Sequence, residues 1–135
     1  MRFRAHCLAG ITFTMYAIPA LAHHSFSMFD QTQTMEVQGT VKEFLWTNPH
    51  SWLQIVAVDP QGEMTEWSIE MSAVGALTRD GWTTSTVSTG DLVTVTAHPL
   101  RDGSPGGQFV GIVLPNGEKM THTYRDTPVS TIPPR

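Results

Sequence analysis

Histidines are the residues of this chain best suited to chemistry. Five of them follow the first twenty-two residues, and they are His23, His24, His50, His98 and His122. A neutral imidazole is a common ligand for copper, zinc and nickel, and Cu(II) favours tetragonal sets of nitrogen ligands. Cleavage before His23 would also free an α-amine of ordinary pKa about 8, which could chelate an ion together with the ring. The spacing predicts a copper site, or one for zinc or nickel, made by His23, His24, His98 and His50.

The first twenty-two residues predict the cleavage that would create this amine. Arg2 and Arg4 are basic, residues 8–18 are mostly apolar, and Ala20-Leu21-Ala22 is a small-x-small cleavage signal. The apolar run is too short to span a bilayer comfortably, and no later apolar run is long enough. We therefore expect a signal peptide over residues 1–22 and a periplasmic or secreted mature protein that is not inserted in a membrane.

Composition excludes several classes of function for the mature chain. Removing residues 1–22 takes away two of the eight basic residues and none of the twelve acidic ones, which leaves a net charge of −6. Such a balance argues against binding to nucleic acid, which needs a positive face. The single cysteine, Cys7, lies in the leader, so a thiolate nucleophile or metal ligand is excluded. No catalytic motif is recognised either, and we expect a binding module rather than an enzyme.

Six strand-like segments and one helix must position the histidines. The phase of the apolar residues changes around Lys42-Glu43, which predicts a bulge in the first strand. Ser72 is the expected N-cap of the helix, and Gly81 is expected to end it. The expected strands are 35–46, 52–58, 64–71, 92–97, 108–114 and 118–121, and the expected helix is 73–79.

Three strands, a helix and further strands are the order of an OB-fold. We expect a mainly β protein, a small OB-like Greek-key barrel of five to six strands with one short helix after strand three. A β-sandwich is the alternative, but it would not need the helix. The expected organisation is a signal peptide (1–22), an N-terminal arm (23–34), the barrel domain (35–121) and a flexible tail (122–135).

This topology decides which histidines can meet. If strands one and four pair antiparallel, His98 lies near the arm and is the natural third ligand. His50 lies at the far end of strand one, although an arm of twelve residues can span up to about 40 Å. A structural role is the alternative for each: His50 capping a turn, His98 bonding a loop carbonyl, and His122 exposed to solvent in the tail.

The loops between strands one and two and between strands four and five offer a second, metal-free site. Its expected ligand-binding residues are Trp46, Asn48, Trp52, Arg101 and Asp102. The tryptophans either stack a planar ligand or fill the core. Arg101 either binds an anion or pairs with Asp102, Glu66 or Glu70, and these two glutamates share the strand face expected to meet solvent or a ligand. The alternative function is therefore a metal-free adaptor for a periplasmic protein or a small-ligand module.

Several segments together resemble a known family. They are residues 39–44 (GTVKEF), 46–52 (WTNPHSW), 66–67 (EW) and 98–103 (HPLRDG). They are similar to a family of small secreted proteobacterial proteins known as a domain of unknown function, over about residues 23 to 120. The resemblance implies a periplasmic, compact β-rich domain that often begins with an arm like His23-His24-Ser25-Phe26. It implies no reaction.

Overall fold

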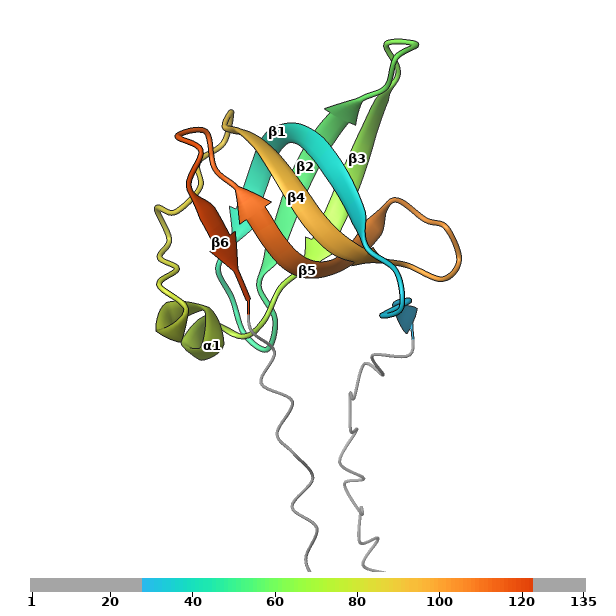
Figure 1. Cartoon of the computed structure of the whole chain (residues 1–135). Helices are drawn as coiled ribbons and strands as arrows, with labels where there is room; N and C mark the ends of the chain where they lie inside the picture. The colour runs from blue at the N-terminus through green and yellow to red at the C-terminus, as the bar shows by residue number, and fades with distance from the viewer. Residues whose placement is uncertain (1–27, 123–135) are drawn as a thin grey trace, which may run out of the picture.

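A six-stranded sheet closes on itself in the computed structural model, which describes residues 28–122 (Figure 1). The strand order is β3-β2-β1-β4-β5-β6, and an additional pairing of β3 with β5 closes the barrel. The elements are β1 (Met35–Leu45), β2 (Trp52–Val58), β3 (Met64–Glu70), α1 (Val74–Arg79), β4 (Leu92–Pro99), β5 (Gly106–Val113) and β6 (Lys119–Thr121). This is the expected OB-like topology, with five strands in the barrel, β6 added at the edge, and one short helix after β3.

The barrel closes through a short parallel pairing. Ser68 lies opposite Gly106, and Glu70 lies opposite Gln108. A Cβ atom on Gly106 would lie 2.9 Å from the carbonyl oxygen of Ser68, so a residue without a side chain is required there. This closure excludes the sandwich alternative. It also explains why β5 begins two residues before the expected start.

The long first strand serves both sides of the barrel. Its first half, from Met35 to Thr40, pairs with β4, and its second half pairs with β2. The register with β2 shifts between Val41 and Glu43, which confirms the expected bulge. A bulge increases the local bend and twist of a strand, and here it lets one strand turn from one neighbour to the other.

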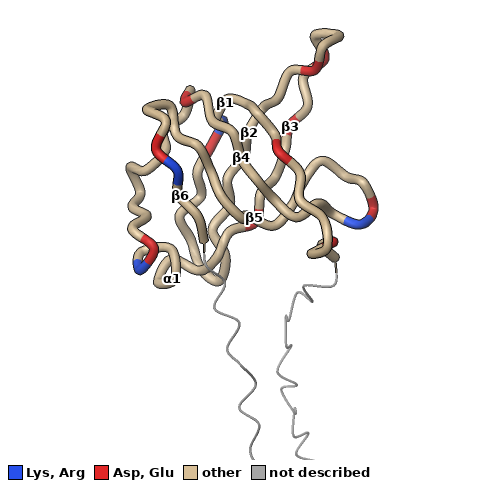
Figure 2. Tube along the Cα trace, viewed as in Figure 1, with Lys and Arg blue, Asp and Glu red and all other residues tan. Residues whose placement is uncertain are grey.

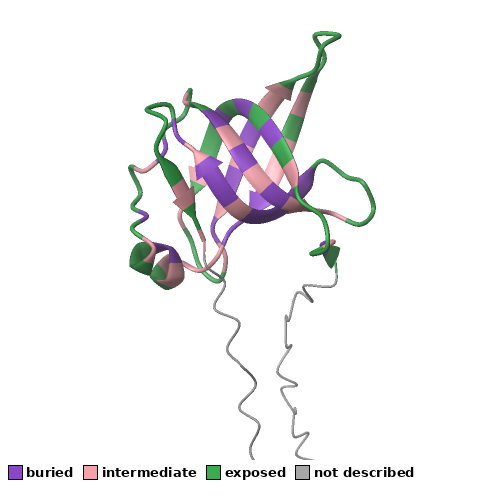
Figure 3. Cartoon of the chain, in the orientation of Figure 1, coloured by how far each residue is buried: buried purple, intermediate pink, exposed green. Residues whose placement is uncertain are grey.

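Buried apolar residues form one core cluster, and buried positions recur along the barrel strands (Figure 3). Phe109 is fully buried, and its ring meets that of Trp82 edge-on, with centroids 5.4 Å apart. Full burial of such a side chain is worth about 1.5–3 kcal/mol. Trp82 and Val87, which follow the helix, are both buried in this core. Trp46 and Trp67 are partly buried and pack against the same core.

The helix differs from the expectation at its start. It begins at Val74, and its N-cap, Ala73, has no side chain that can bond to the helix; the Asn48 side chain accepts from the amide of Val74 instead. The expected N-cap role of Ser72 is therefore wrong, and its hydroxyl bonds to a histidine instead. The end of the helix is as expected, because Gly81 follows the C-cap with φ of +89°.

Charged residues lie mainly in the loops and turns, with some in the strands (Figure 2). In the part of the chain that the structure describes, no helix has the length and apolarity needed to cross a membrane.

Candidate functional site

Two groups of polar side chains flank the outer face of the barrel. The first, which we call the arm junction, consists of residues 29–33 packed against residues 98–101 and Gln108. The second, which we call the helix pocket, consists of residues 48–51, 70–76, Asp80 and His122. Figure 1 shows the arm and α1 on different sides of the barrel, with β5 between them.

The arm docks on the barrel through its backbone and one buried ring. Phe29 forms a β-bridge with Leu100 and is 4% exposed. The amide of Asp30 donates to the carbonyl of Pro99 at 2.8 Å, and the amide of Arg101 donates to the carbonyl of Met28 at 3.0 Å. The described part of the arm therefore lies against the end of β4, as the antiparallel pairing of β1 and β4 predicts.

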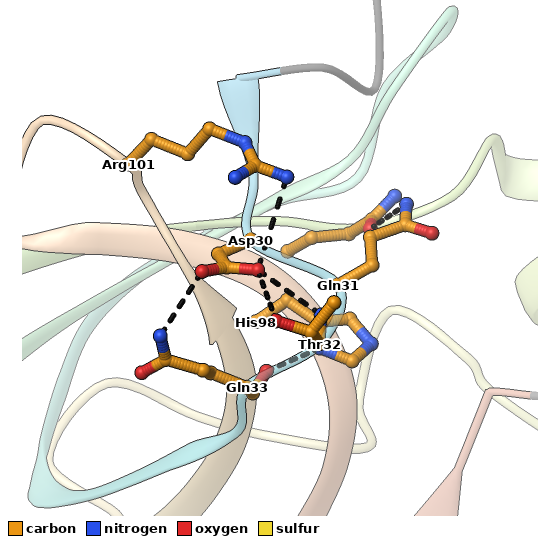
Figure 4. A network of polar contacts seen from close by, with 7 residues as sticks. Asp30, Gln31, Thr32, Gln33, His98 and Arg101 are labelled. Atoms are coloured by element: carbon orange, nitrogen blue, oxygen red, sulfur yellow. Dashed lines mark hydrogen bonds and ion pairs between the residues drawn. The ribbon is translucent and has the colours of Figure 1, made fainter.

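Asp30 organises the polar contacts of the arm junction (Figure 4). Its Oδ1 accepts bonds from the amide of Thr32 at 3.1 Å and from the Thr32 hydroxyl at 2.7 Å. Its Oδ2 accepts a bond from Gln33 Nε2 at 3.0 Å, and Arg101 Nη2 lies 3.8 Å from Oδ1. The bonds from Thr32, and less so the charge of Arg101, hold the pKa of Asp30 below its ordinary 3.8.

His98 has a fixed orientation in this junction. Its Nδ1 lies 2.7 Å from the carbonyl oxygen of Gln33 (Figure 4). Because a carbonyl oxygen only accepts, Nδ1 must carry the proton, and in the neutral ring the lone pair then lies on Nε2. Histidines that bind metals commonly donate their other ring N–H to a carbonyl in this way. The loop-carbonyl role expected for His98 as an alternative is thus present, and it suits the ring to metal binding as well.

His50 belongs to the helix pocket. Its Nδ1 contacts Glu70 Oε1, and the Glu70 side chain is only 10% exposed. Alternation along β3 places Glu70 on the outer face, but the expectation that it meets solvent is wrong, because Glu70 is 8% exposed and pairs with the loop histidine.

His50 and His98 each have a separate partner. Glu70, Gln108 and His98 lie opposite one another on neighbouring strands, which puts about 10 Å between the Cα atoms of Glu70 and His98. Within residues 28–122, no three His, Cys, Asp or Glu side chains form a group that could hold a metal ion. His23 and His24 lie outside the described residues, so the expected four-histidine set stays a prediction.

Three further side chains of the helix pocket form a relay. His122 Nδ1 contacts Asp80 Oδ2, and His122 Nε2 lies 2.6 Å from the Ser72 hydroxyl. The expectation that His122 is solvated in a tail is wrong, because its side chain is 6% exposed. Since the Asp80 carboxylate accepts from Nδ1, Nε2 of the neutral ring is left to accept the hydroxyl proton of Ser72.

A cavity of about 230 Å³ lies beside this relay. Its walls are Pro49, His50, Glu70, Met71, Ser72, Ala73 and Ala76. Asn48 ties its own loop to the start of α1, because its Oδ1 accepts a bond from the amide of Val74 at 3.2 Å. The pocket therefore combines apolar walls with a histidine, a buried carboxylate and a serine hydroxyl.

The other expected ligand-binding residues have structural contacts. Trp46 meets Phe44 edge-on, with ring centroids 5.6 Å apart, and Trp52 is a partly buried residue of β2. Asp102 accepts a bond from the amide of Ser104, and this bond is the main cause that lowers the pKa of Asp102. The partner of Arg101 that the structure gives is Asp30, while Glu66 pairs with Lys42 at 2.6 Å.

Sequence reasoning missed Asp30, Glu70, Ser72 and Asp80 as site residues. Asp30 carries a usable signal, because an Asp followed two residues later by Thr favours a local turn in which the carboxylate accepts backbone bonds. Ser72 and Asp80 have no such signal, because their common partner, His122, is 50 and 42 residues away.

Comparisons with known proteins identify a family for the chain but no activity. No curated protein matches the chain significantly. Among solved structures, the chain is similar to the mitochondrial single-stranded DNA-binding protein Rim1 of S. cerevisiae, with 22% identity, a TM-score of 0.46, and coverage of 61% of this chain and 93% of that one. That likeness concerns the fold alone. Residues 12–109 match a family described as being of unknown function, and the chain therefore belongs to the DUF6152 family.

Proposed function

We propose that this protein is a binding module of the periplasm that takes up Cu(II) at the arm junction. The ligands would be His98, the ring and α-amine of His23, and His24, once residues 1–22 have been removed. The observation that carries the proposal is the bond from His98 Nδ1 to the Gln33 carbonyl, because it leaves the lone pair of Nε2 for a metal.

The docked arm supports the reach that this site needs. Met28 is paired with Arg101, and His98 lies three residues before Arg101 along β4 and its loop, or about 10 Å away. The four-residue step from His24 to Met28 can span up to about 14 Å. The histidines of the arm can therefore meet the His98 ring without any change in the docked residues.

Calorimetric titration with Cu(II) tests the proposal on protein that begins at His23. His98→Gln removes a ring ligand but leaves a polar side chain, and we expect it to weaken binding about 10–100-fold. One extra glycine before His23 converts the amine to an amide and is expected to weaken binding to a similar extent. His50→Gln is the matched control and should leave the affinity unchanged.

Two results would contradict the proposal. One is an affinity that neither the extra glycine nor His98→Gln changes, and the other is an affinity that falls only with His50→Gln. Electron paramagnetic resonance of the Cu(II) complex gives an independent check, since the proposed site supplies several nitrogen ligands.

A metal-free ligand-binding module is the second candidate, and the cavity of the helix pocket favours it. A calorimetric titration that detects no binding of Cu(II) would support this candidate over the first. The two proposals concern different parts of the surface, so variants of one leave the other intact.

A further inference from the structure

The helix pocket contains the side-chain order of an activated serine. A reactive serine needs a base that can take its hydroxyl proton, and that base needs a group that fixes its tautomer. Here Ser72 contacts His122 Nε2 at 2.6 Å, and Nδ1 of the same ring contacts Asp80. The two contacts have the donors and acceptors that the reaction requires, because the carboxylate can only accept the Nδ1 proton and so leaves Nε2 to accept from Ser72.

Burial keeps the relay in place. The His122 side chain is 6% exposed, and Asp80 is 24% exposed at the C-cap of α1. Ser72 lines the cavity and is half-buried, whereas His122 and Asp80 are not among its lining residues. The base is thus shielded from solvent, and Ser72 is the member of the relay that borders the cavity.

The cavity limits what can react. Its volume of about 230 Å³ lies below the roughly 300–1,000 Å³ of pockets for drug-sized ligands. Pro49, Met71, Ala73 and Ala76 supply apolar walls suited to a short hydrocarbon group, and the His50–Glu70 pair supplies the polar side. A carboxylic ester with a short acyl chain has both an apolar part for these walls and a polar part for this side.

We propose that Ser72 is a nucleophile that reacts with short-chain carboxylic esters, with His122 as its base and Asp80 as a positioning residue. Ser72 Oγ bonds to the carbonyl carbon while its proton passes to His122 Nε2. The bond from that carbon to the alkoxy oxygen breaks, and the alcohol leaves with the proton. Water then attacks the acyl-serine and gives a proton to Nε2, which returns it to Ser72 Oγ as the carboxylic acid departs.

Covalent labelling with a fluorophosphonate probe tests this proposal on the full mature chain. Peptide mass spectrometry is expected to find the probe on Ser72. Ser72→Ala is expected to abolish labelling, and the buried Ser51 is the control that should stay unlabelled. Hydrolysis of p-nitrophenyl acetate provides the second readout and should fall with the same variants.

Three variants separate chemistry from folding. His122→Ala should slow labelling at least about 100-fold, and added imidazole should restore part of the rate, which a purely structural role would not allow. Asp80→Asn should slow labelling at least about tenfold, and Asp80→Glu should keep part of the wild-type rate. The reason is that the charge of the carboxylate, more than the shape of the side chain, fixes the orientation of the His122 ring. Circular dichroism of each variant reports whether the barrel is folded.

The outcomes decide the proposal. Labelling of Ser72 that depends on His122 and Asp80 supports it. An unlabelled but folded wild-type protein overturns it, as does a rate on Ser72 that folded His122→Ala and Asp80→Asn proteins keep. Neither result changes the expected Cu(II) titration, because no ligand of the arm junction takes part.

Discussion

The arm junction and the helix pocket both hold a histidine against an oxygen acceptor, yet they are built from different kinds of contact. At the arm junction, Asp30 bonds to groups two and three residues away, and Arg101 beside it is more than half exposed. In the helix pocket, His122 joins groups 42 and 50 residues away, and its side chain is almost wholly buried. His98 also has a distant partner, Gln33, 65 residues away, so burial is the main difference between the two regions. Exposed contacts at the arm junction can break while the barrel stays folded, whereas the buried contacts of the helix pocket persist only while the whole barrel is folded.

Stability measurements on matched histidine variants should show this difference most clearly. His122→Ala leaves Asp80 and Ser72 without the buried ring, and we expect it to lower the free energy of unfolding by about 3 kcal/mol. His98→Ala removes a partly exposed ring with one carbonyl partner and should cost less than about 1 kcal/mol. Urea unfolding provides both values, and equal losses would remove the distinction between the two regions.

Two glutamates on the same face of β3 sharpen the comparison further. Glu70→Gln removes the charge from a buried pair with His50 and should cost about 2 kcal/mol. Glu66→Gln removes the charge from an exposed pair, in which the Glu66 side chain is 50% exposed and that of Lys42 is 53% exposed. This substitution should lower the free energy of unfolding by less than about 1 kcal/mol. If the cost of Glu66→Gln matched or exceeded that of Glu70→Gln, burial would not be what strengthens the helix pocket.

Removal of the arm anchor should act locally. Phe29→Ala deletes the one buried ring of the described arm, and we expect about 1.5 kcal/mol of destabilisation, below the roughly 3–5 kcal/mol of a truncated core Phe, because the arm can detach. Limited proteolysis should cut the arm of this variant faster while the barrel resists. Cutting within the barrel at the same rate would show that the arm is part of the cooperative core.

The smallest effect concerns the pH dependence of the arm junction. The lowered pKa of Asp30 means that its ionised form stabilises the folded state above the ordinary value of 3.8, and that this contribution is lost as the pH falls through the folded pKa. Asp30→Asn should therefore melt at a slightly lower temperature than wild type near pH 7. The gap should close in acid, and a gap that stayed constant with pH would contradict the assignment.

The fold was largely predictable from the sequence because its signals are local. The strand expected between turns at about 52–58 has the bounds of β2, and the phase change at Lys42-Glu43 predicted the bulge. The order of the elements then favoured the barrel. Strand ends were less accurate where pairing partners decide them, as at Gly106, whose place in β5 depends on its contact with β3.

The sites were predictable only where local rules applied. The pairing of β1 with β4 correctly predicted that the arm lies beside His98. Alternation along β3, in contrast, predicted an exposed Glu70, and Glu70 is buried. Its outer face is covered by the loop that carries His50, and no periodicity in β3 reports that loop. The role of His122 depends on where the chain lies after β6, which composition does not encode.

The docking of the arm also sets an order of assembly. The arm's contacts join Gln33 to His98 and Gln31 to Gln108, which are 65 and 77 residues apart in the chain. Contacts this distant form only after the loop entropy between them has been overcome. During synthesis the arm emerges before β4 and β5, and it must wait for these strands before it can dock. A chain in which the arm junction has formed is therefore one in which β4 and β5 are already in place.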